Sequence, residues 1–412
     1  MKNLKSAFVA ACILCGMDAS AHDASDVNNP RAWMSRISDS VYLHQLSIPG
    51  THDSATGNGA VSDFLDSFAR TQDLDLAAQF DAGVRAFDLR PSVSDGVLKI
   101  YHGIVETKLT FDEALSILCD RLDAYPTEFV VVTMRHEDDH ESNEEKGQWA
   151  GLMNDVLGKE KYSGRFVDFE NRLTLGDMRG KILLLSRDSY ASKPIGGYIT
   201  GWSHSAAFED QKNGRIQGTS SRKQARLYMQ DFYQTKDAID TKLASISTLL
   251  DFSITINTIT SDIWVINSTS GYSATFANSD AYRVNAQSTN ISVVDYLSGP
   301  IHAGPTGVVY MDFAGIDKSG VREVNGRRLV DALIENNFRY TMRGSTSAIY
   351  NIHDSAHYMV KVENGHVTAH GRIDIYTIDG RLCASGVGRV SVTRPGIYIV
   401  RTSSSARKIV VE

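Results

Sequence analysis

Charged side chains that can move protons or bind anions recur in this sequence at the ends of short apolar runs. The stretch LSIPGTHDSAT, residues 46–56, closes one run with a Pro-Gly turn and then places His52 beside Asp53. The following runs end in a further set of polar residues, namely Asp88, Arg90, His102, Arg135, Arg187, Asp231 and Asp312. If these run ends meet, one site holds two imidazoles, three guanidinium groups and several carboxylates.

This combination is suited to phosphoester chemistry. Imidazole titrates near neutrality, so one histidine can take a proton from a nucleophile while the other gives one to a leaving oxygen. Arginine offers a planar fork of donors to phosphate oxygens and stabilises the charge of the transition state. No His-x-Glu or Asp-rich ligand spacing requires a cation, and the arginines would repel one. We therefore expect no metal and no other cofactor.

Each of these residues also has a purely structural interpretation. His52 could be a helix cap or a surface residue, and Asp88 lies two residues from Arg90 on one strand face, where it would hold the guanidinium. The other arginines could be partners in structural ion pairs, and Asp231 could cap a helix. The acidic stretch EDDHESNEEK, residues 137–146, could bind a metal, but a solvated loop is the simpler interpretation. The shared position at run ends favours a common site.

Eight apolar runs alternate with helical patterns between about residues 43 and 313. They read YLHQLSI, GVRAFDLR, LKIYHG, FVVVTMRH, KILLLSR, ARLYMQD, SITINTI and GVVYMDF. Several are nearly continuous and rich in β-branched residues, as in parallel strands buried on both faces. Eight such strands predict an α/β fold, a (β/α)8-like TIM barrel whose strand ends meet at one mouth. A doubly wound open sheet is the alternative.

The connections between these runs predict an irregular barrel. TFDEALSILCDRLDAYP has apolar residues at helical spacing and a terminating proline, so it predicts a helix. Other connections are short for a full helix. Residues 261–306 are rich in Ser, Thr and Asn and are interpreted as long loops.

The N-terminus has the features of a signal peptide over residues 1–21. Lys2 and Lys5 precede a short apolar core, and the small residues ASA come directly before His22. The stretch VAAC within it loosely resembles a lipobox, so a lipoprotein is the alternative. We expect export, with the protein secreted or held on the outer cell surface.

Composition excludes some classes of partner. The chain has 412 residues and a formal net charge of −7, which gives no electrostatic footprint for nucleic acid. No apolar stretch is long enough to span a membrane. After signal removal only Cys119 and Cys383 remain, which is not a disulfide framework. We expect a monomer.

The chain divides into two domains after the signal peptide. Residues 22–343 are expected to form the catalytic barrel. Residues 344–412 alternate apolar and polar side chains between Asp-Gly and Pro-Gly turns, which predicts a small all-β, sandwich-like C-terminal domain.

Five motifs in order resemble bacterial phosphatidylinositol-specific phospholipase C. The box SIPGTHDS is followed by AFDLR, YHG, LGDMRGKILLLSR and VVYMDF, and the resemblance covers about residues 33–338. It implies cleavage of phosphatidylinositol, or of glycosyl-phosphatidylinositol anchors, at a membrane surface. The products would be diacylglycerol and inositol 1,2-cyclic phosphate, formed without a metal.

The resemblance also implies a catalytic role for five residues. His52 would be the general base that deprotonates the inositol 2-hydroxyl, oriented by Asp312. Arg90 would bind the phosphate. His102 would be the general acid for the diacylglycerol oxygen, with Asp53 as its carboxylate partner.

Substrate binding would fall to a second set, comprising Arg135, Arg187, Trp202, Asp231 and Tyr233. The chain departs from the family pattern at two positions in this region. Arg135 stands where members often have lysine, and His204 lies near a position where an acid is expected, which puts one inositol contact in doubt.

The C-terminal region resembles the sorting domain of the Por (type IX) secretion system, through its IYTIDGRL, GIYIV and KIVV segments. That resemblance implies recognition by export machinery and removal of about the last 70 residues. An accessory β-sandwich is the alternative.

Three other functions are alternatives to this hypothesis. A glycerophosphodiesterase on a similar barrel normally holds a metal through a Glu-x-Asp pair, but the matching stretch here is FDLR. A calcium-dependent phospholipase is disfavoured by the same Arg90. A catalytically inactive surface protein that binds inositol lipids or glycans would have no need to keep both histidines.

Overall fold

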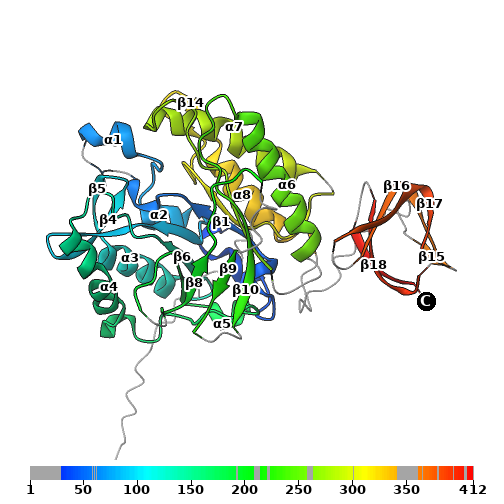
Figure 1. Cartoon of the computed structure of the whole chain (residues 1–412), viewed down its shortest axis with the longest axis horizontal. Helices are drawn as coiled ribbons and strands as arrows, with labels where there is room; N and C mark the ends of the chain where they lie inside the picture. The colour runs from blue at the N-terminus through cyan, green and yellow to red at the C-terminus, as the bar shows by residue number, and fades with distance from the viewer. Residues whose placement is uncertain are drawn as a thin grey trace, which may run out of the picture.

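A closed barrel of nine strands forms the larger part of the computed structural model (Figure 1). Around the barrel lie β1 (Ser47–Thr51), β12 (Gly307–Met311), β11 (Ile263–Ser268), β10 (Gln224–Gln230), β9 (Arg215–Gln217), β8 (Gly197–Thr200), β7 (Ile182–Ser186), β6 (Val130–Met134) and β2 (Ala86–Leu89). Neighbours are parallel except at β9, which runs antiparallel to β8 and β10. The TIM-barrel prediction is confirmed, and closure excludes the doubly wound sheet.

The structure describes residues 29–57, 59, 61, 63–191, 194–207, 214–219, 223–257, 263–299, 301–340, 361–363, 365–377, 380–392, 394–402 and 406–411. The predicted signal peptide and the predicted domain boundary at 343–344 lie outside these ranges. Within them, Cys119 and Cys383 are both free thiols, and none of the helices has the length and hydropathy of a membrane span.

Helices cover the barrel unevenly. They are α1 (Asp63–Ala69), α2 (Leu76–Asp81), α3 (Phe111–Ala124), α4 (Asn143–Leu157), α5 (Leu175–Met178), α6 (Ile239–Asn257), α7 (Ser279–Ser298) and α8 (Gly326–Asn336). The predicted helix at TFDEALSILCDRLDAYP is α3, which begins with a reciprocal capping box between Thr110 and Glu113. Between β7 and β10 the described residues form no helix, so the barrel is irregular, as the short connections indicated.

Six of the eight apolar runs contain barrel strands, but two predictions were wrong. LKIYHG lies in β4 (Val97–His102), which pairs with β3 (Pro91–Ser94) and β5 (Val105–Thr110) in a separate antiparallel sheet. The first five residues of SITINTI end α6, and its last two lie outside the described residues. Its β-branched residues favour a strand, but Ser253 and Ile256 continue the buried face that Leu249 and Leu250 begin.

The loop prediction for residues 261–306 was also wrong, because this segment contains β11 and α7. The buried face of α7 includes Asn285, Thr289 and Asn290 at helical spacing, so hydrophobicity alone hides its period. These polar groups are satisfied inside the protein. The Asn290 amide donates to the carbonyl of Asp312 at 3.1 Å and accepts from the hydroxyl of Thr269 at 2.8 Å.

Side chains of the barrel strands alternate between two apolar layers. In β6, Val130 and Val132 pack in the layer that includes the helices, whereas Val131 packs in the layer that fills the barrel. Thr133 points inward in the same register as Val131, and its hydroxyl lies 3.0 Å from that of Tyr310 on β12. This polar pair forms the floor of a pocket at the carboxyl end of the strands.

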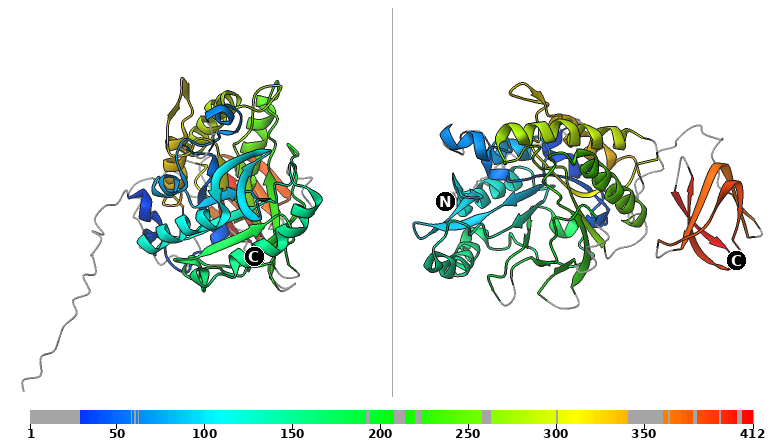
Figure 2. Two further views of the ribbon diagram at one scale, coloured as in Figure 1. Left: turned by 90° about the vertical axis from the view of Figure 1, so that its left-hand side faces the viewer. Right: turned by 45° about the horizontal axis from the view of Figure 1, so that its top comes forward.

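The C-terminal region is an antiparallel sheet with its own core, drawn in orange and red in Figure 2. It contains β15 (Lys361–Glu363), β16 (His366–Thr377), β17 (Leu382–Ser391), β18 (Gly396–Thr402) and β19 (Ala406–Val411). Ile373, Ile375 and Val400 are among the residues of its buried cluster. The prediction of a small all-β region after the barrel is confirmed.

Candidate active site

His52 follows directly after β1, and the backbone before it differs from the sequence prediction. Pro49 and Gly50 lie within β1, and the chain turns only after Thr51. A Cβ on Gly50 would lie 2.8 Å from the ring of Tyr310, so the strand needs glycine there for packing rather than for a turn. Asp53 then adopts the left-handed conformation with φ 43°, which aspartate tolerates better than most residues.

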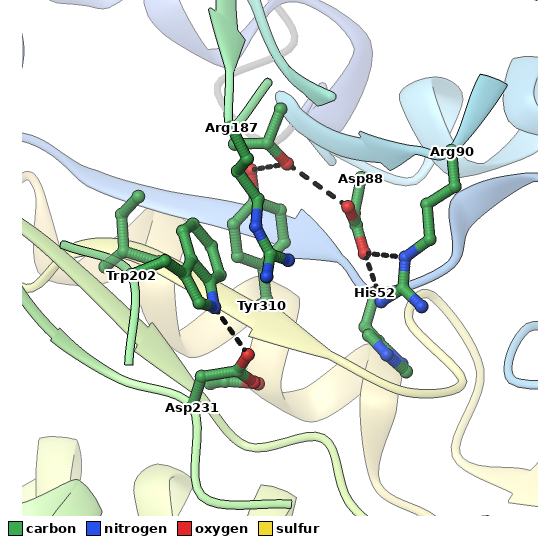
Figure 3. Close-up of a pocket in the computed structure, with 10 residues that line it drawn as sticks. His52, Asp88, Arg90, Arg187, Trp202, Asp231 and Tyr310 are labelled. Carbon is green, nitrogen blue, oxygen red and sulfur yellow. Dashed lines mark hydrogen bonds and ion pairs between the residues drawn. The ribbon is translucent and has the colours of Figure 1, made fainter. Parts of the chain in front are cut away.

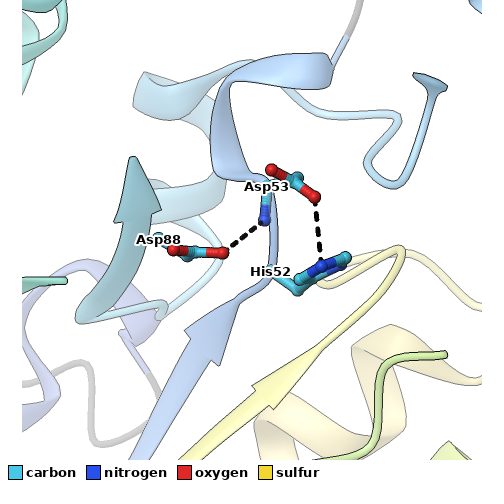
Figure 4. A group of neighbouring side chains, drawn as sticks. All are labelled: His52, Asp53 and Asp88. Carbon is cyan, nitrogen blue, oxygen red and sulfur yellow. Dashed lines mark hydrogen bonds and ion pairs between the residues drawn. The ribbon is translucent and has the colours of Figure 1, made fainter. Parts of the chain in front are cut away.

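Two carboxylates hold His52 between them. Its Nδ1 lies 2.9 Å from Oδ1 of Asp312. Its Nε2 lies 3.0 Å from Oδ2 of Asp53, a contact drawn in Figure 4. Asp312 comes directly after β12, so the parallel pairing of β1 and β12 brings the two residues together. Nδ1 therefore faces the fully buried Asp312, and Nε2 faces the almost fully buried Asp53.

Burial and neighbouring charges have opposite effects on the pKa values of His52 and Asp53. Burial alone would lower the pKa of His52, but the carboxylates of Asp53 and Asp312 outweigh it and raise that pKa to about 9. Burial likewise opposes ionisation of Asp53, yet Arg90 and the two histidines lower its pKa. The free site therefore favours an imidazolium at His52 beside an ionised Asp53.

His102 reaches the same carboxylate from the separate β3–β4–β5 sheet. Its Nδ1 lies 2.8 Å from the carbonyl oxygen of Ala69, an acceptor that fixes a proton on Nδ1. Its Nε2 lies 3.3 Å from Oδ2 of Asp53 and 3.4 Å from the hydroxyl of Tyr282 on α7. The ring centroids of His52 and His102 are 6.1 Å apart, so one substrate group can lie within reach of both.

Arg90 lies among three carboxylates next to the histidines. Its Nε is 3.0 Å from Asp53, one terminal nitrogen is 2.9 Å from Asp88, and the other is 3.7 Å from Glu137. Asp88 therefore holds Arg90, as the spacing on the strand predicted. Burial disfavours the charge, but the three carboxylates raise the pKa of Arg90 further above its usual value. The guanidinium is a fixed positive charge beside both imidazoles.

A pocket opens beside this cluster (Figure 3), and the empty space in it, counted out to open solvent, is about 310 Å³. Its lining comprises His52, Asp88, Arg90, Thr133, Arg187, Trp202, Asp231, Ile266, Ser268 and Tyr310. It is polar on the histidine side and has an aromatic wall on the other.

That wall is built from three of the predicted binding residues. The Arg187 guanidinium carbon lies 3.9 Å from the ring centroid of Trp202, and the indole Nε1 donates to Oδ2 of Asp231 at 2.9 Å. Burial would raise the pKa of Asp231, but His204, Arg187 and Trp202 lower it to about 2. The wall therefore presents a partly exposed carboxylate acceptor and a stacked cation, groups suited to a polyhydroxylated ring.

The other two predicted binding residues lie nearer the rim. Tyr233 is partly exposed beyond the end of β10, and its ring meets that of His204 edge-on at 5.0 Å. His204 also lies 3.0 Å from Asp231 through Nδ1, so it caps the carboxylate where an acid was expected. The Arg135 guanidinium lies 3.4 Å from Glu137 and does not line the pocket.

Glu137 is a site residue that the sequence analysis missed. The sequence predicted that Glu137 belongs to a solvated acidic loop. In the structure it is buried, and it accepts a hydrogen bond from the backbone N–H of Gly103 at 3.0 Å. It links Arg90 and Arg135 to the turn that follows His102. Its position two residues beyond Arg135, at the end of a barrel strand, is the signal that could have revealed it. Thr133 and Tyr310 carried no comparable signal.

One group of side chains in the described part of the chain has the spacing of a metal site. His52, Asp53 and Asp88 offer ligand atoms within 4.8 Å of one another. However, the Arg90 guanidinium contacts both carboxylates, and both ring nitrogens of His52 already face carboxylates. A cation placed among these ligands would be repelled by Arg90, so the donor set fits a metal poorly.

Comparison with known proteins identifies the family of the barrel. Residues 46–188 match the family described as phosphatidylinositol-specific phospholipase C, X domain. The 1-phosphatidylinositol phosphodiesterase of Staphylococcus aureus (strain NCTC 8325 / PS 47) is 30% identical over 260 residues, which cover 60% of this chain and 75% of that protein. The protein of the same name from Listeria monocytogenes is 34% identical over 167 residues, covering 40% and 51%.

Solved structures support the fold. A phosphatidylinositol-specific phospholipase C from Staphylococcus aureus superposes with a TM-score of 0.58 at 23% identity, covering 74% of this chain and 97% of that one. The enzyme from Listeria monocytogenes superposes with a TM-score of 0.55 at 23% identity, covering 75% and 98%. At these identities the structural likeness establishes the barrel architecture only.

Proposed function

Since the chain belongs to the phosphatidylinositol-specific phospholipase C family, we propose that it cleaves phosphatidylinositol to diacylglycerol and inositol 1,2-cyclic phosphate. The observation that carries this proposal is the arrangement around Asp53, which contacts both histidines and Arg90 beside a pocket. Two proton-transfer groups and a fixed cation are what an intramolecular attack on phosphorus requires.

In the proposed reaction, His52 removes the proton of the inositol 2-hydroxyl. The resulting oxygen bonds to phosphorus while the bond from phosphorus to the glycerol oxygen breaks, and His102 gives that oxygen its proton. Arg90 stabilises the negative charge that develops on the phosphate oxygens. No water enters this step, so the first phosphate product is cyclic.

Each carboxylate has a separate role in this scheme. Asp312 accepts from His52 Nδ1, which leaves Nε2 to act as the base and stabilises the imidazolium once it forms. Asp53 stabilises His102 while that residue holds its proton. Because Asp53 also contacts His52, it links the charge states of the two imidazoles.

The aromatic wall of the pocket would bind the inositol ring. Asp231 accepts hydrogen bonds from ring hydroxyls, Arg187 donates to them, and Tyr233 closes the outer side. Arg135 is held too far out by Glu137 to line the pocket, so its role in this scheme is electrostatic attraction of the anionic headgroup.

We further propose that the reaction needs no metal, since Arg90 occupies the space between carboxylates where a divalent cation would bind. The scheme accommodates inositol lipids with or without a glycan on the ring, because Tyr233 at the rim is exposed. Export through a signal peptide and a C-terminal sorting domain completes the proposal.

The test is phosphorus NMR of phosphatidylinositol vesicles incubated with the enzyme in excess EDTA. We expect the signal of a five-membered cyclic phosphate to grow as the lipid signal falls, and His52→Ala to abolish both changes. A chelated enzyme that becomes active only when calcium is added would contradict metal independence. Release of phosphatidic acid instead of a cyclic phosphate would contradict the reaction itself.

A further inference from the structure

A buried lysine lies beneath the pocket and takes no part in the proposed chemistry. Lys242, near the start of α6, is completely buried. Its ammonium donates to the carbonyl oxygen of Phe232 at 2.6 Å and to Oε1 of Gln230 at 3.1 Å. Among the described residues, no carboxylate lies within ion-pair distance of it.

Both acceptors flank Asp231, the carboxylate of the aromatic wall. Gln230 is the last residue of β10, and its Oε1 also accepts from the backbone of Phe232 at 2.7 Å. The Gln230 side chain donates onward to Asn267 at 3.0 Å and to the carbonyl of Ser268 at 2.8 Å, both on β11. The ammonium is thus the centre of a network that fixes the chain on either side of Asp231.

This hydrogen-bond network also reaches α6, the helix that contains Lys242. The Asn267 amide donates to the carbonyl oxygen of Ile246, one turn after Lys242 on α6. Ser268, whose carbonyl accepts the second hydrogen bond from the Gln230 side chain, lines the pocket. These contacts therefore connect α6 to β10 and β11. Asp231, directly after β10, and Ser268 on β11 both line the pocket.

Burying an ammonium without an ionic partner is costly, and an apolar side chain would fill the same space without that cost. Burial lowers the pKa of Lys242 to about 7, although the fields of Asp231 and Asp312 oppose the change. What the ammonium supplies, and a methionine would not, is a pair of donors for Gln230 and for the Phe232 carbonyl.

We propose that Lys242 is a positioning residue for headgroup binding: it fixes Gln230 and the Phe232 carbonyl, and so holds Asp231 and Tyr233 in place against the pocket. The proposal rests on the function proposed above and goes beyond it. Lys242 touches no substrate itself. Its loss should therefore weaken binding of the inositol ring without slowing the chemical step.

The test measures kcat and KM for a short-chain phosphatidylinositol kept as soluble monomers. Lys242→Met should raise KM about tenfold, the scale of one hydrogen bond to a charged group, with kcat changed less than about twofold. The dissociation constant of myo-inositol as a competitive inhibitor should rise by the same factor. Lys242→Gln keeps amide donors and should raise KM by less than about twofold. If Lys242→Met does not fold, a tenfold rise of KM in Lys242→Gln would contradict the positioning role.

A double-mutant cycle separates positioning from a general loss of stability. In an Asp231→Asn background, Lys242→Met should raise KM by less than about twofold, because the group it positions is already gone. The matched control is Ser253→Ala, which removes a buried hydrogen bond at 2.8 Å to Pro305 from the far end of the same helix. It should lower the melting temperature and leave KM unchanged.

Three outcomes would overturn the positioning role. A lower kcat at unchanged KM, or equal effects of Lys242→Met in both backgrounds, overturns the positioning role. A KM increase in Ser253→Ala equal to that in Lys242→Met also overturns it, since it shows a nonspecific effect of stability. Failure of the wild-type enzyme to turn over phosphatidylinositol would instead contradict the proposed function.

Discussion

Asp53 contacts each of the three cationic or protonatable side chains on which the proposed reaction depends. Its two oxygens lie 3.0 Å from Arg90 and 3.0 Å from His52, and the oxygen facing His52 is also 3.3 Å from His102. The resemblance assigned Asp53 to His102 alone, but the geometry gives it to both histidines. Removing its charge therefore changes the base as well as the acid.

The division between acid and base can be tested with the leaving group. A general acid matters only as far as the leaving oxygen needs a proton, and p-nitrophenolate needs far less help than a diacylglycerol alkoxide. His102→Ala should lose ~10²–10⁴ in rate on phosphatidylinositol and much less on p-nitrophenyl inositol phosphate. His52→Ala should be severely impaired on both, since the 2-hydroxyl must be deprotonated in each case.

Carboxylate variants extend this comparison. Asp312→Ala should be impaired on both substrates, as His52→Ala is, because Asp312 contacts His52 and not His102. Asp53→Ala should lose activity on both substrates. If the good leaving group rescues His52→Ala instead of His102→Ala, the acid and base assignments are reversed.

The pH dependence follows from the charges around His52. A base must be neutral to act, and Asp53 and Asp312 raise the pKa of His52 to about 9, so kcat/KM should still rise with pH above neutrality. Asp312→Asn removes one of the two carboxylates, so the rising limb should move to lower pH although the maximal rate falls. Profiles from about pH 5 to pH 10 on the soluble substrate measure this shift. A limb that stays in place or moves upward would contradict it.

The sequence predicted the chemistry of the site better than its geometry. Residues such as His52, Arg90 and Asp231 could be found because each ends an apolar run. Glu137 could not be separated from the acidic residues around it without knowing that its side chain is buried. The position of Arg135 outside the pocket depends on that same hidden carboxylate.

At the scale of elements, predictions succeeded for most strands that are buried on both faces, although β11, which is buried throughout, was missed. The strands β6, β7 and β12 are buried throughout and mostly apolar, and they were found directly. The helix α7 was missed because its buried face is partly polar, and SITINTI was misread because β-branched residues fill a helix end. The His102 strand was found but assigned to the barrel, since periodicity does not reveal which sheet a strand joins.

Several apolar side chains are exposed on the segments that leave the carboxyl ends of the strands. They are Phe68 of α1 (52% exposed), Ile104 after His102 (74%), Phe276 after β11 (79%) and Val321 after β12 (86%). On α1, Leu65 instead packs against Val61, Ala69 and Val105, and the side chain of Phe64 lies outside the described residues. A rim of this kind is suited to contact with a lipid surface.

We therefore expect Phe68→Ser to lower activity on phosphatidylinositol vesicles several-fold while leaving turnover of a soluble inositol phosphodiester unchanged. The reason is that the exposed half of the Phe68 side chain gains apolar contact when the enzyme lies on a bilayer. Val97→Ser is the matched control, since Val97 is 44% exposed but lies at the end of β4 away from His102. Equal losses on both substrates would mean that Phe68 serves the fold.

On the scale of the whole molecule, the order of an α/β barrel followed by an all-β region was predictable because the hydrophobic period changes from mixed to strictly alternating. The irregularity of the barrel was predictable from short connections, but the antiparallel β9 was not. It has only three residues, and a short segment of this kind carries no period of its own.

The barrel and the C-terminal sheet should prove separable, because their buried clusters share no residue. The ion pair between Arg401 and Asp251, at 3.8 Å, joins partly exposed side chains, and such surface pairs contribute only about 0–1 kcal/mol. A chain ending at residue 340 should therefore keep kcat, KM and melting temperature within error of the full chain. In the native host it should accumulate inside the cell envelope instead of outside, if the C-terminal region is an export signal. Loss of the barrel's cooperative melting transition would show that the two parts depend on each other for folding, whereas normal export of the shortened chain would leave the region an accessory domain.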